Sequence, residues 1–170
     1  TAQLPLPPDW HFVLIEPASW AGLSGRPEDQ AFAELPAVSE EVSQRLVREV
    51  TENMLPALEA TEFDSFAESV YQFGRMAGEC FASVQGGAYH GPVLQRVIDQ
   101  LRGAGVRAAG QSSWGPTLFA LLPDRHTAAS LVEQMRDWPD LDQAQFVITP
   151  ASAHGAMVEL ETDPGAVSCP

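Results

Sequence analysis

The spacing of apolar residues changes several times along the chain, and these changes restrict the fold more than any other feature of the sequence. Short apolar runs suit buried strands, whereas apolar residues repeated every three or four positions suit amphipathic helices. Strands are expected at 11–17, 117–123, 143–150 and 155–160. Helices are expected at 39–56, 63–80, 92–103 and after Asp124, with a helical turn at 29–35. This order predicts an α+β fold with helices packed on one face of a mostly antiparallel sheet.

Residues with known preferences for helix ends support these boundaries. Ser39 is suited to cap the first long helix, and Asp124 is suited to cap the last one. Pro56 should end or bend the first helix because proline lacks the N–H that a helix interior needs. Pro92 should begin the third long helix, and Gly103 and Gly105 should close it.

Composition narrows the functional classes. The 170 residues suit one domain, and the net charge of −14 argues against a nucleic-acid or polybasic membrane-surface protein. All nine basic residues are arginine, which excludes a lysine nucleophile or Schiff base from this chain. No apolar run is long enough to span a membrane, so we expect a cytoplasmic protein. Cys80 and Cys169 are expected as free thiols rather than a disulfide.

Two stretches between the helices look too particular for plain loops: FASVQGGAYHGP at 81–92 and AAGQSSWGPT at 108–117. The first contains Gln85, Gly86 and Gly87 just before a helix, which is the outline of a phosphate-binding turn. The second follows a glycine-rich run, 103–110, in which Arg107 could supply a cation. Spacing alone does not separate this interpretation from glycines that merely cap a helix and make a turn.

Four side chains that follow Gly110 favour a functional interpretation, because a simple turn does not need them. They are Gln111, Ser112, Ser113 and Trp114. A serine hydrolase is disfavoured, since this stretch misses the G-x-S-x-G pattern by one residue and a strand follows it. No His, Cys, Asp or Glu pair has the spacing of a zinc site. The aromatic stripe at 63–80 is interpreted as core packing rather than as a cofactor site.

At these residues the chain resembles the C-terminal domain of the GHMP kinase superfamily. Within it the chain is most similar to the β-ribofuranosylaminobenzene 5′-phosphate synthase group. The likeness is carried by the Phe73–Gly74 pair, FASVQGGAY at 81–89 and GQSSWGPT at 110–117. It extends over most of residues 10–160 and implies the ferredoxin-like fold of that C-terminal domain. The implied division is a connecting segment with one strand at 1–36, the domain at 37–160 and a flexible tail at 161–170.

The resemblance also implies an activity and its partners. Members of the group transfer ribose 5-phosphate from phosphoribosyl pyrophosphate to 4-aminobenzoate, with loss of pyrophosphate and CO₂, on the way to tetrahydromethanopterin. Mg²⁺ is expected for the whole enzyme and none for this chain alone; catalytic residues are not assigned. The residues expected to contact substrate or phosphate are Gln85, Gly86, Gly87, Tyr89, Arg107, Gly110, Gln111, Ser112, Ser113 and Trp114.

The main phosphate loop of the superfamily, a proline followed by Gly-Leu-Gly-Ser-Ser, does not occur in these 170 residues. We therefore expect a C-terminal portion that needs an N-terminal GHMP domain as its partner and is inactive alone. Two alternatives stay open: a domain of an ATP-dependent small-molecule kinase, or a non-enzymatic binding domain that forms a homodimer.

Overall fold

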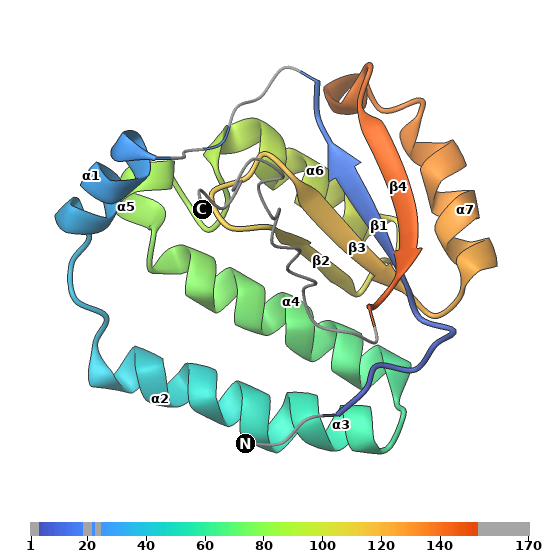
Figure 1. Cartoon of the computed structure of the whole chain (residues 1–170), viewed down its shortest axis with the longest axis horizontal. Helices are drawn as coiled ribbons and strands as arrows, with labels where there is room; N and C mark the ends of the chain where they lie inside the picture. The colour runs from blue at the N-terminus through green and yellow to red at the C-terminus, as the bar shows by residue number, and fades with distance from the viewer. Residues whose placement is uncertain (1–3, 19–21, 23–24, 153–170) are drawn as a thin grey trace, which may run out of the picture.

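The computed structural model describes residues 4–18, 22 and 25–152. Its centre is a four-stranded sheet in the order β2-β3-β1-β4, and every neighbouring pair is antiparallel (Figure 1). The strands are β1 (His11–Glu16), β2 (Ala108–Gln111), β3 (Leu118–Leu122) and β4 (Gln145–Pro150). The α+β prediction is confirmed. The strand expected at 155–160 lies outside the described residues.

The first strand occupies the middle of the sheet. Val13 of β1 pairs with Ala120 of β3 on one side and with Ile148 of β4 on the other. The segment expected to connect two domains therefore supplies the strand that joins the two halves of this sheet. Strand β2 was not expected, because AAGQ contains no apolar run; its pairing with β3 defines it.

Helices fill the chain between β1 and β2 and between β3 and β4. They are α1 (Arg26–Glu34), α2 (Glu40–Arg48), the π-helix η1 (Glu49–Met54), α3 (Leu55–Glu59), α4 (Phe63–Glu79), α5 (Ala82–Gln85), α6 (Gly91–Gly103), α7 (Arg125–Met135) and the 3₁₀ turn η2 (Pro139–Leu141). The capping predictions are confirmed. The Ser39 side chain accepts from Val42 N, and the Asp124 side chain accepts from Thr127 N.

Pro56 does not end the first long helix, contrary to the expectation. It lies in α3, and α2, η1 and α3 follow one another without a break to Glu59. A proline in a regular helix clashes with the carbonyl four residues earlier. The turns just before Pro56 are π-helical, and this wider winding allows the helix to continue through the proline.

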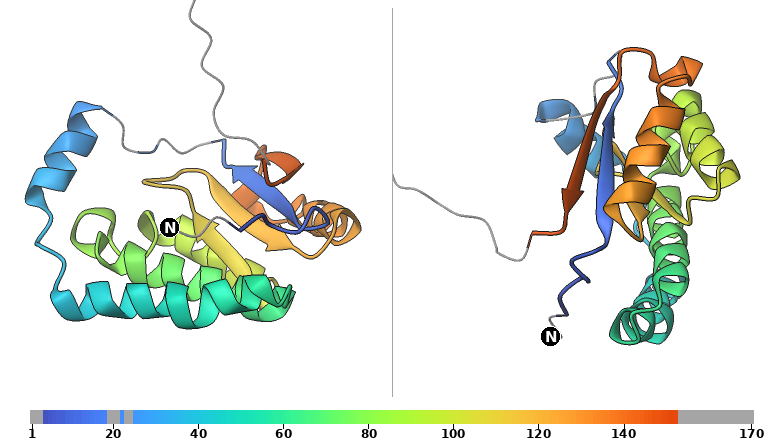
Figure 2. Two further views of the ribbon diagram at one scale, coloured as in Figure 1. Left: turned by 60° about the horizontal axis from the view of Figure 1, so that its bottom comes forward. Right: turned by 90° about the vertical axis from the view of Figure 1, so that its right-hand side faces the viewer.

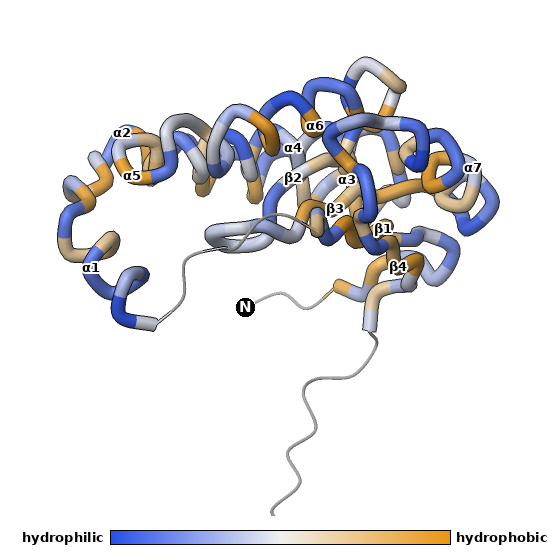
Figure 3. Tube along the Cα trace, turned by 90° about the horizontal axis from the view of Figure 1, so that it is seen from above, coloured by the Kyte–Doolittle hydropathy of each residue, from blue (hydrophilic) through white to orange (hydrophobic). Residues whose placement is uncertain are grey.

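Two clusters of buried side chains hold the layers together. The main cluster joins the sheet to α6 and α7, with Val13, Ile15, Leu118 and Ile98 fully buried. The second joins Trp10, Phe66 and the β2–β3 pair Ala108 and Leu121, whose side chains point to the other face of the sheet. Figure 2 shows α7 beside β1 and β4, and Figure 3 shows apolar strands with blue and orange alternating along the helices.

Arg102 fastens α6 to α4. Its guanidinium lies 2.8 Å from the Glu68 carboxylate and 4.1 Å from the centre of the Tyr71 ring. Partial burial alone would raise the pKa of Glu68, but hydrogen bonds from Gln72 and Arg102 outweigh it and lower that pKa. This pair holds α4 in a fixed position relative to α6. None of the helices that the structure describes is long and apolar enough to cross a membrane.

Candidate functional site

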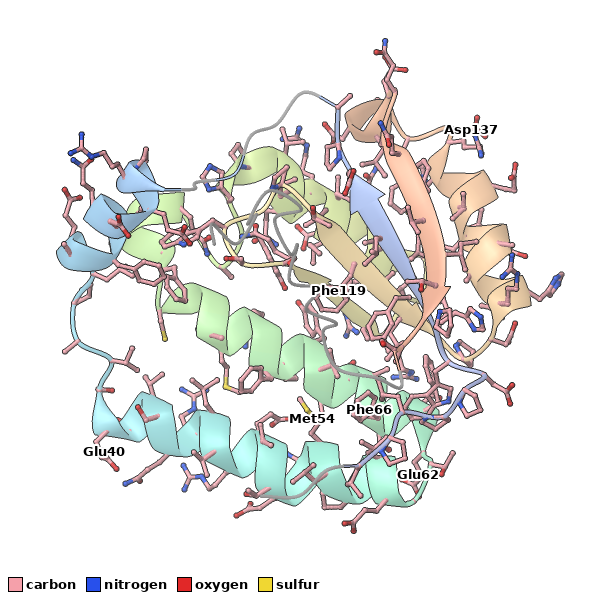
Figure 4. All side chains as sticks on the ribbon, in the orientation of Figure 1. Glu40, Met54, Glu62, Phe66, Phe119 and Asp137 are labelled. Atoms are coloured by element: carbon pink, nitrogen blue, oxygen red, sulfur yellow. The ribbon has the colours of Figure 1, made fainter. Side chains whose placement is uncertain are left out.

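A cavity of about 450 Å³ lies between α4, the sheet and the two stretches singled out in the sequence. We call it the aromatic cavity, because six of its lining residues are aromatic: Phe32, Phe73, Phe81, Tyr89, Trp114 and Phe119. The other lining residues are Met54, Val70, Gly74, Ala77, Gly78, Gln85, Ala88, Gln111 and Ser113. Figure 4 labels Phe119 on the sheet and Met54 on the helical segment that includes η1. Both motif stretches therefore contribute to one cavity.

Three of the rings form an edge-to-face cluster. The Trp114 ring centre lies 5.1 Å from that of Phe81 and 5.4 Å from that of Phe32. Such geometries place the positive edge of one ring on the negative face of another. Trp114 is 4% exposed, whereas Phe32, from α1, is 52% exposed. The cluster fixes Trp114 as a rigid wall and leaves part of Phe32 open to solvent.

The amide groups of Gln85 and Gln111 tie the two stretches together. Gln111 Oε1 accepts from the N–H of His90 at 2.7 Å, and Gln111 Nε2 donates to the Ser113 carbonyl at 2.8 Å. Gln85 is 6% exposed and donates through Nε2 to the carbonyl of Gly78. These side chains bond to backbone groups of both stretches and of α4, so their amides hold the cavity walls in place.

The turn Ser112–Gly115 forms the exposed part of the second stretch. Gly115 N–H donates to the Ser112 carbonyl at 2.9 Å, and Ser113 has a φ of +50°. Within the described part of the chain, the N–H groups of Ser113 and Trp114 have no hydrogen-bond acceptor. Ser112 and Ser113 are exposed. This turn therefore offers donors beside the cavity.

The three glycines that were expected to contact substrate or phosphate lie in different structural settings. Gly86 has a φ of +86° and its N–H closes α5 by bonding to the Ala82 carbonyl, so it acts as a helix cap. Gly87 is half-buried in the loop that follows. Gly110 is in β2, where an added Cβ would lie 2.6 Å from the Phe119 ring. Gly110 thus allows Phe119 to lie flat across β2 and line the cavity.

Arg107 lies apart from the other expected residues. It directly precedes β2, and Gln111 is the last residue of that strand. At the usual rise per strand residue, Arg107 and Gln111 are about 13 Å apart. Its guanidinium forms an ion pair with Asp64 at 3.2 Å, with both groups largely exposed. It does not line the aromatic cavity. The structure therefore does not bring the one cation expected at the site to it.

Two buried polar atoms have no hydrogen-bond partner among the described residues: the Tyr89 hydroxyl and His90 Nδ1. Tyr89 is 3% exposed, and this burial raises the pKa of its hydroxyl. Its ring also belongs to the main core. Tyr89 is therefore both a structural residue and a wall of the cavity.

Two close backbone contacts shape the rim. An added Cβ at Gly78 would overlap the Ala88 carbonyl, and one at Gly22 would overlap the carbonyl of Gly115. Helix α4 thus touches the first stretch directly, and residue 22 touches the second. Only glycine permits these approaches without a shift of the backbone.

Several lining residues were not expected from the sequence. Met54, Val70 and Phe73 belong to helical stripes that look like core packing, and Phe119 belongs to an apolar strand. Phe32 lies in the segment 29–35, for which only a helical turn was expected. Among these unexpected lining residues, only Phe73 was signalled by the sequence, through the Phe73–Gly74 pair on which the resemblance rests. In the regions that the structure covers, no group of three or more His, Cys, Asp or Glu residues could hold a metal ion.

Comparisons with known proteins agree with this architecture. The family model described as GHMP kinases C terminal matches residues 54–140, half of the chain. The chain is 26% identical over 136 residues to the β-ribofuranosylphenol 5′-phosphate synthase of Methanothermobacter thermautotrophicus, covering 79% of this chain and 40% of the relative. That name specifies a phenol, whereas the resemblance had suggested an aminobenzene.

Solved structures share the fold at low sequence identity. Mevalonate pyrophosphate decarboxylase from Streptococcus pyogenes has a TM-score of 0.65 at 9% identity, covering 91% of this chain and 48% of that one. L. major mevalonate kinase has a TM-score of 0.65 at 11% identity, covering 89% and 45%. The chain thus spans less than half the length of these relatives. By its sequence and its sheet topology, it belongs to the GHMP kinase C-terminal family.

Proposed function

We propose that this chain is the C-terminal part of a transferase that joins a phosphoribosyl group to a small aromatic acid, as in the synthase group. The observation that carries the proposal is the aromatic cavity, because its six rings suit a flat aromatic substrate. The 26% identity to a ribofuranosylphenol phosphate synthase supports the same class. Phosphoribosyl pyrophosphate is the proposed donor, and either 4-aminobenzoate or 4-hydroxybenzoate is the proposed acceptor.

The exposed turn beside the cavity suits the phosphate groups of the donor. The N–H groups of Ser113 and Trp114 and the hydroxyls of Ser112 and Ser113 are available there. The amides of Gln85 and Gln111 are already engaged in the protein, and Arg107 is distant, so these three residues are not proposed as phosphate ligands.

Most of the groups that bind pyrophosphate must then come from outside this chain. Pyrophosphate departure normally requires cations, and no charged residue of the described chain lines the cavity. We propose that an N-terminal GHMP domain supplies the phosphate loop and binds Mg²⁺. The chain alone is therefore proposed to be inactive.

The test compares this chain with the same chain joined to an N-terminal GHMP domain. Each is assayed with phosphoribosyl pyrophosphate, Mg²⁺ and either aromatic acid, with release of CO₂ and pyrophosphate as the readouts. Product from the joined protein and none from the isolated chain is expected. Steady product from the chain alone would refute its inactivity, and ATP-dependent phosphorylation without CO₂ release would favour a kinase.

A variant separates the cavity from the donor site. Trp114→Ala removes a wall of the cavity but leaves the backbone N–H at position 114. In the joined protein it should raise KM for the aromatic acid about tenfold or more, and change KM for phosphoribosyl pyrophosphate much less. Equal increases in both constants would mean that Trp114 does not contact the aromatic substrate.

A further inference from the structure

The lining of the aromatic cavity carries no charged side chain in the part of the chain that the structure describes. The walls at its α4 side are Val70, Phe73, Gly74 and Ala77, and Phe119 covers the sheet side. Small-molecule sites usually combine such apolar walls with a few polar groups that fix orientation. Here the polar side chains are those of Gln85, Gln111, Ser113 and Tyr89, none of which is charged, so any charge brought into the cavity would lack a counter-charge.

The two amides cannot readily solvate a negative charge either. Gln85 Nε2 is committed to the Gly78 carbonyl at 3.0 Å, and Gln111 Nε2 to the Ser113 carbonyl at 2.8 Å. Turning either amide toward a ligand would leave a carbonyl without its donor. Of the remaining donors, those on Ser113 and on the backbone of the turn lie at the exposed rim. The Tyr89 hydroxyl is buried, and its ring belongs to the main core.

We propose that the aromatic cavity binds an uncharged aromatic ring and disfavours a carboxylate attached to that ring. The ring gains dispersion and edge-to-face contacts with the aromatic walls. An ionised carboxylate at the ring edge would lose water without gaining a cation or a sufficient set of donors. Binding of an aromatic acid is therefore coupled to protonation or to loss of its carboxylate.

This property bears on the reaction, and the following step rests on the proposed function. The carbon that carries the carboxylate attacks C1 of the ribose with the π electrons of the ring. A C–C bond forms, and the C–O bond to pyrophosphate breaks, with its electron pair leaving on pyrophosphate. The carboxyl proton passes to the departing pyrophosphate. The C–CO₂⁻ bond then breaks, CO₂ departs, and that electron pair restores the aromatic ring.

The electrophile approaches the face of the ring, so the ring must present its face to the cavity mouth and its edge to the walls. The carboxylate then lies against apolar side chains rather than in open solvent. Its charge disappears as CO₂ forms, and an environment that does not stabilise the carboxylate favours that step. The cavity thus assists decarboxylation by withholding a counter-charge.

A matched pair of probes tests the proposal on this chain. 4-Hydroxybenzamide and 4-hydroxybenzoate differ mainly in charge, and their binding is followed by calorimetry and by tryptophan fluorescence. At pH 7.5 the amide should bind at least tenfold more tightly than the acid. Between pH 7.5 and 6 the affinity for the acid should rise close to tenfold per pH unit, because only its protonated form enters, while that for the amide stays constant.

Filling the cavity shows whether the probes bind there. An added Cβ at Gly74 meets no atom within 4 Å, so Gly74→Leu places a side chain in the cavity and should weaken binding of the amide tenfold or more. The control Gly103→Leu adds the same group at an exposed glycine outside the cavity and should leave binding unchanged. Melting curves confirm that each variant is folded.

Three results would overturn the inference: equal or tighter binding of the carboxylate at pH 7.5, no binding of either probe, or full binding by Gly74→Leu. These results are separable from the proposed function. An inactive joined protein would refute the transferase without affecting probe binding by this chain. Conversely, an active joined protein whose C-terminal chain prefers the carboxylate would refute this inference alone.

Discussion

Gln111 shows at the scale of one residue how a suspected ligand can be a structural residue. Its side chain bonds to His90 N–H and to the Ser113 carbonyl, and lies 3.4 Å from Gln85 Oε1. Gln111→Ala leaves the part-buried His90 N–H without its acceptor, which costs about 1–3 kcal/mol, whereas water can replace the amide at the exposed Ser113 carbonyl. We expect a lower free energy of unfolding in urea by roughly that amount.

The matched control is Gln95→Ala. Gln95 donates to Asp99 one turn along the exposed face of α6, and such pairs stabilise a helix by about 0.2–0.5 kcal/mol. Similar losses in the two variants would contradict the structural role assigned to Gln111. A large loss of activity in the joined protein without any loss of stability would restore Gln111 as a substrate ligand.

At the scale of elements, α7 depends on its first turn. The Asp124 carboxylate accepts from Thr127 N and from Thr127 Oγ1, both at 2.8 Å. These two hydrogen bonds lower the pKa of Asp124. The stabilisation is therefore complete above the unfolded-state pKa, about 3.9, and is lost as the pH falls through the lower folded-state pKa. Asp124→Ala should lower Tm at pH 7, and the difference from the unaltered chain should shrink on acidification below about pH 4.

Asp137→Ala provides the control for that experiment. Asp137 is exposed, and its side chain forms no hydrogen bond within the described residues, so its removal should change Tm little at either pH (Figure 4). A difference for Asp124→Ala that persists unchanged at pH 3 would show that the cap does not depend on the ionised carboxylate.

At the scale of the whole molecule, charge balance limits stability. The chain has 23 acidic and 9 basic residues, and the ion pairs among its described residues are largely at the surface. A net charge of −14 destabilises the compact state by self-repulsion. Raising NaCl from about 0.01 M to about 0.1 M shortens the screening length from about 30 Å to about 10 Å. Tm should therefore rise over this range, and KCl should give the same increase; a fall in Tm would show that specific ion pairs outweigh the repulsion.

At the same scale, the composition of the cavity lining bears on the proposed function. The sheet and its helices form a domain with two buried clusters, and the aromatic cavity is complete in its walls. The cations that the proposed pyrophosphate donor requires do not line that cavity, and the chain matches its relatives over less than half of their length. The architecture thus supports a division in which this domain holds the ring and another domain holds the phosphates.

The sequence by itself determined the features that depend on near neighbours in the chain. Apolar spacing predicted α4, α6 and α7 and the strands β1, β3 and β4, and cap chemistry predicted the roles of Ser39 and Asp124. The two glycine-containing stretches and the Phe73–Gly74 pair identified the family that the comparisons confirmed. These signals are local, because helix caps, turns and periodic burial act over a few residues.

Only the tertiary structure decided the features that depend on distant contacts. Strand β2 exists because β3 pairs with it, and the helix passes Pro56 because η1 is π-helical. Phe32 and Phe119 meet at one cavity from segments far apart in the chain, while Arg107 is directed to Asp64 and away from it. Whether a glutamine binds a ligand or a backbone carbonyl depends on which groups folding places beside it, and residue type and spacing do not contain that information.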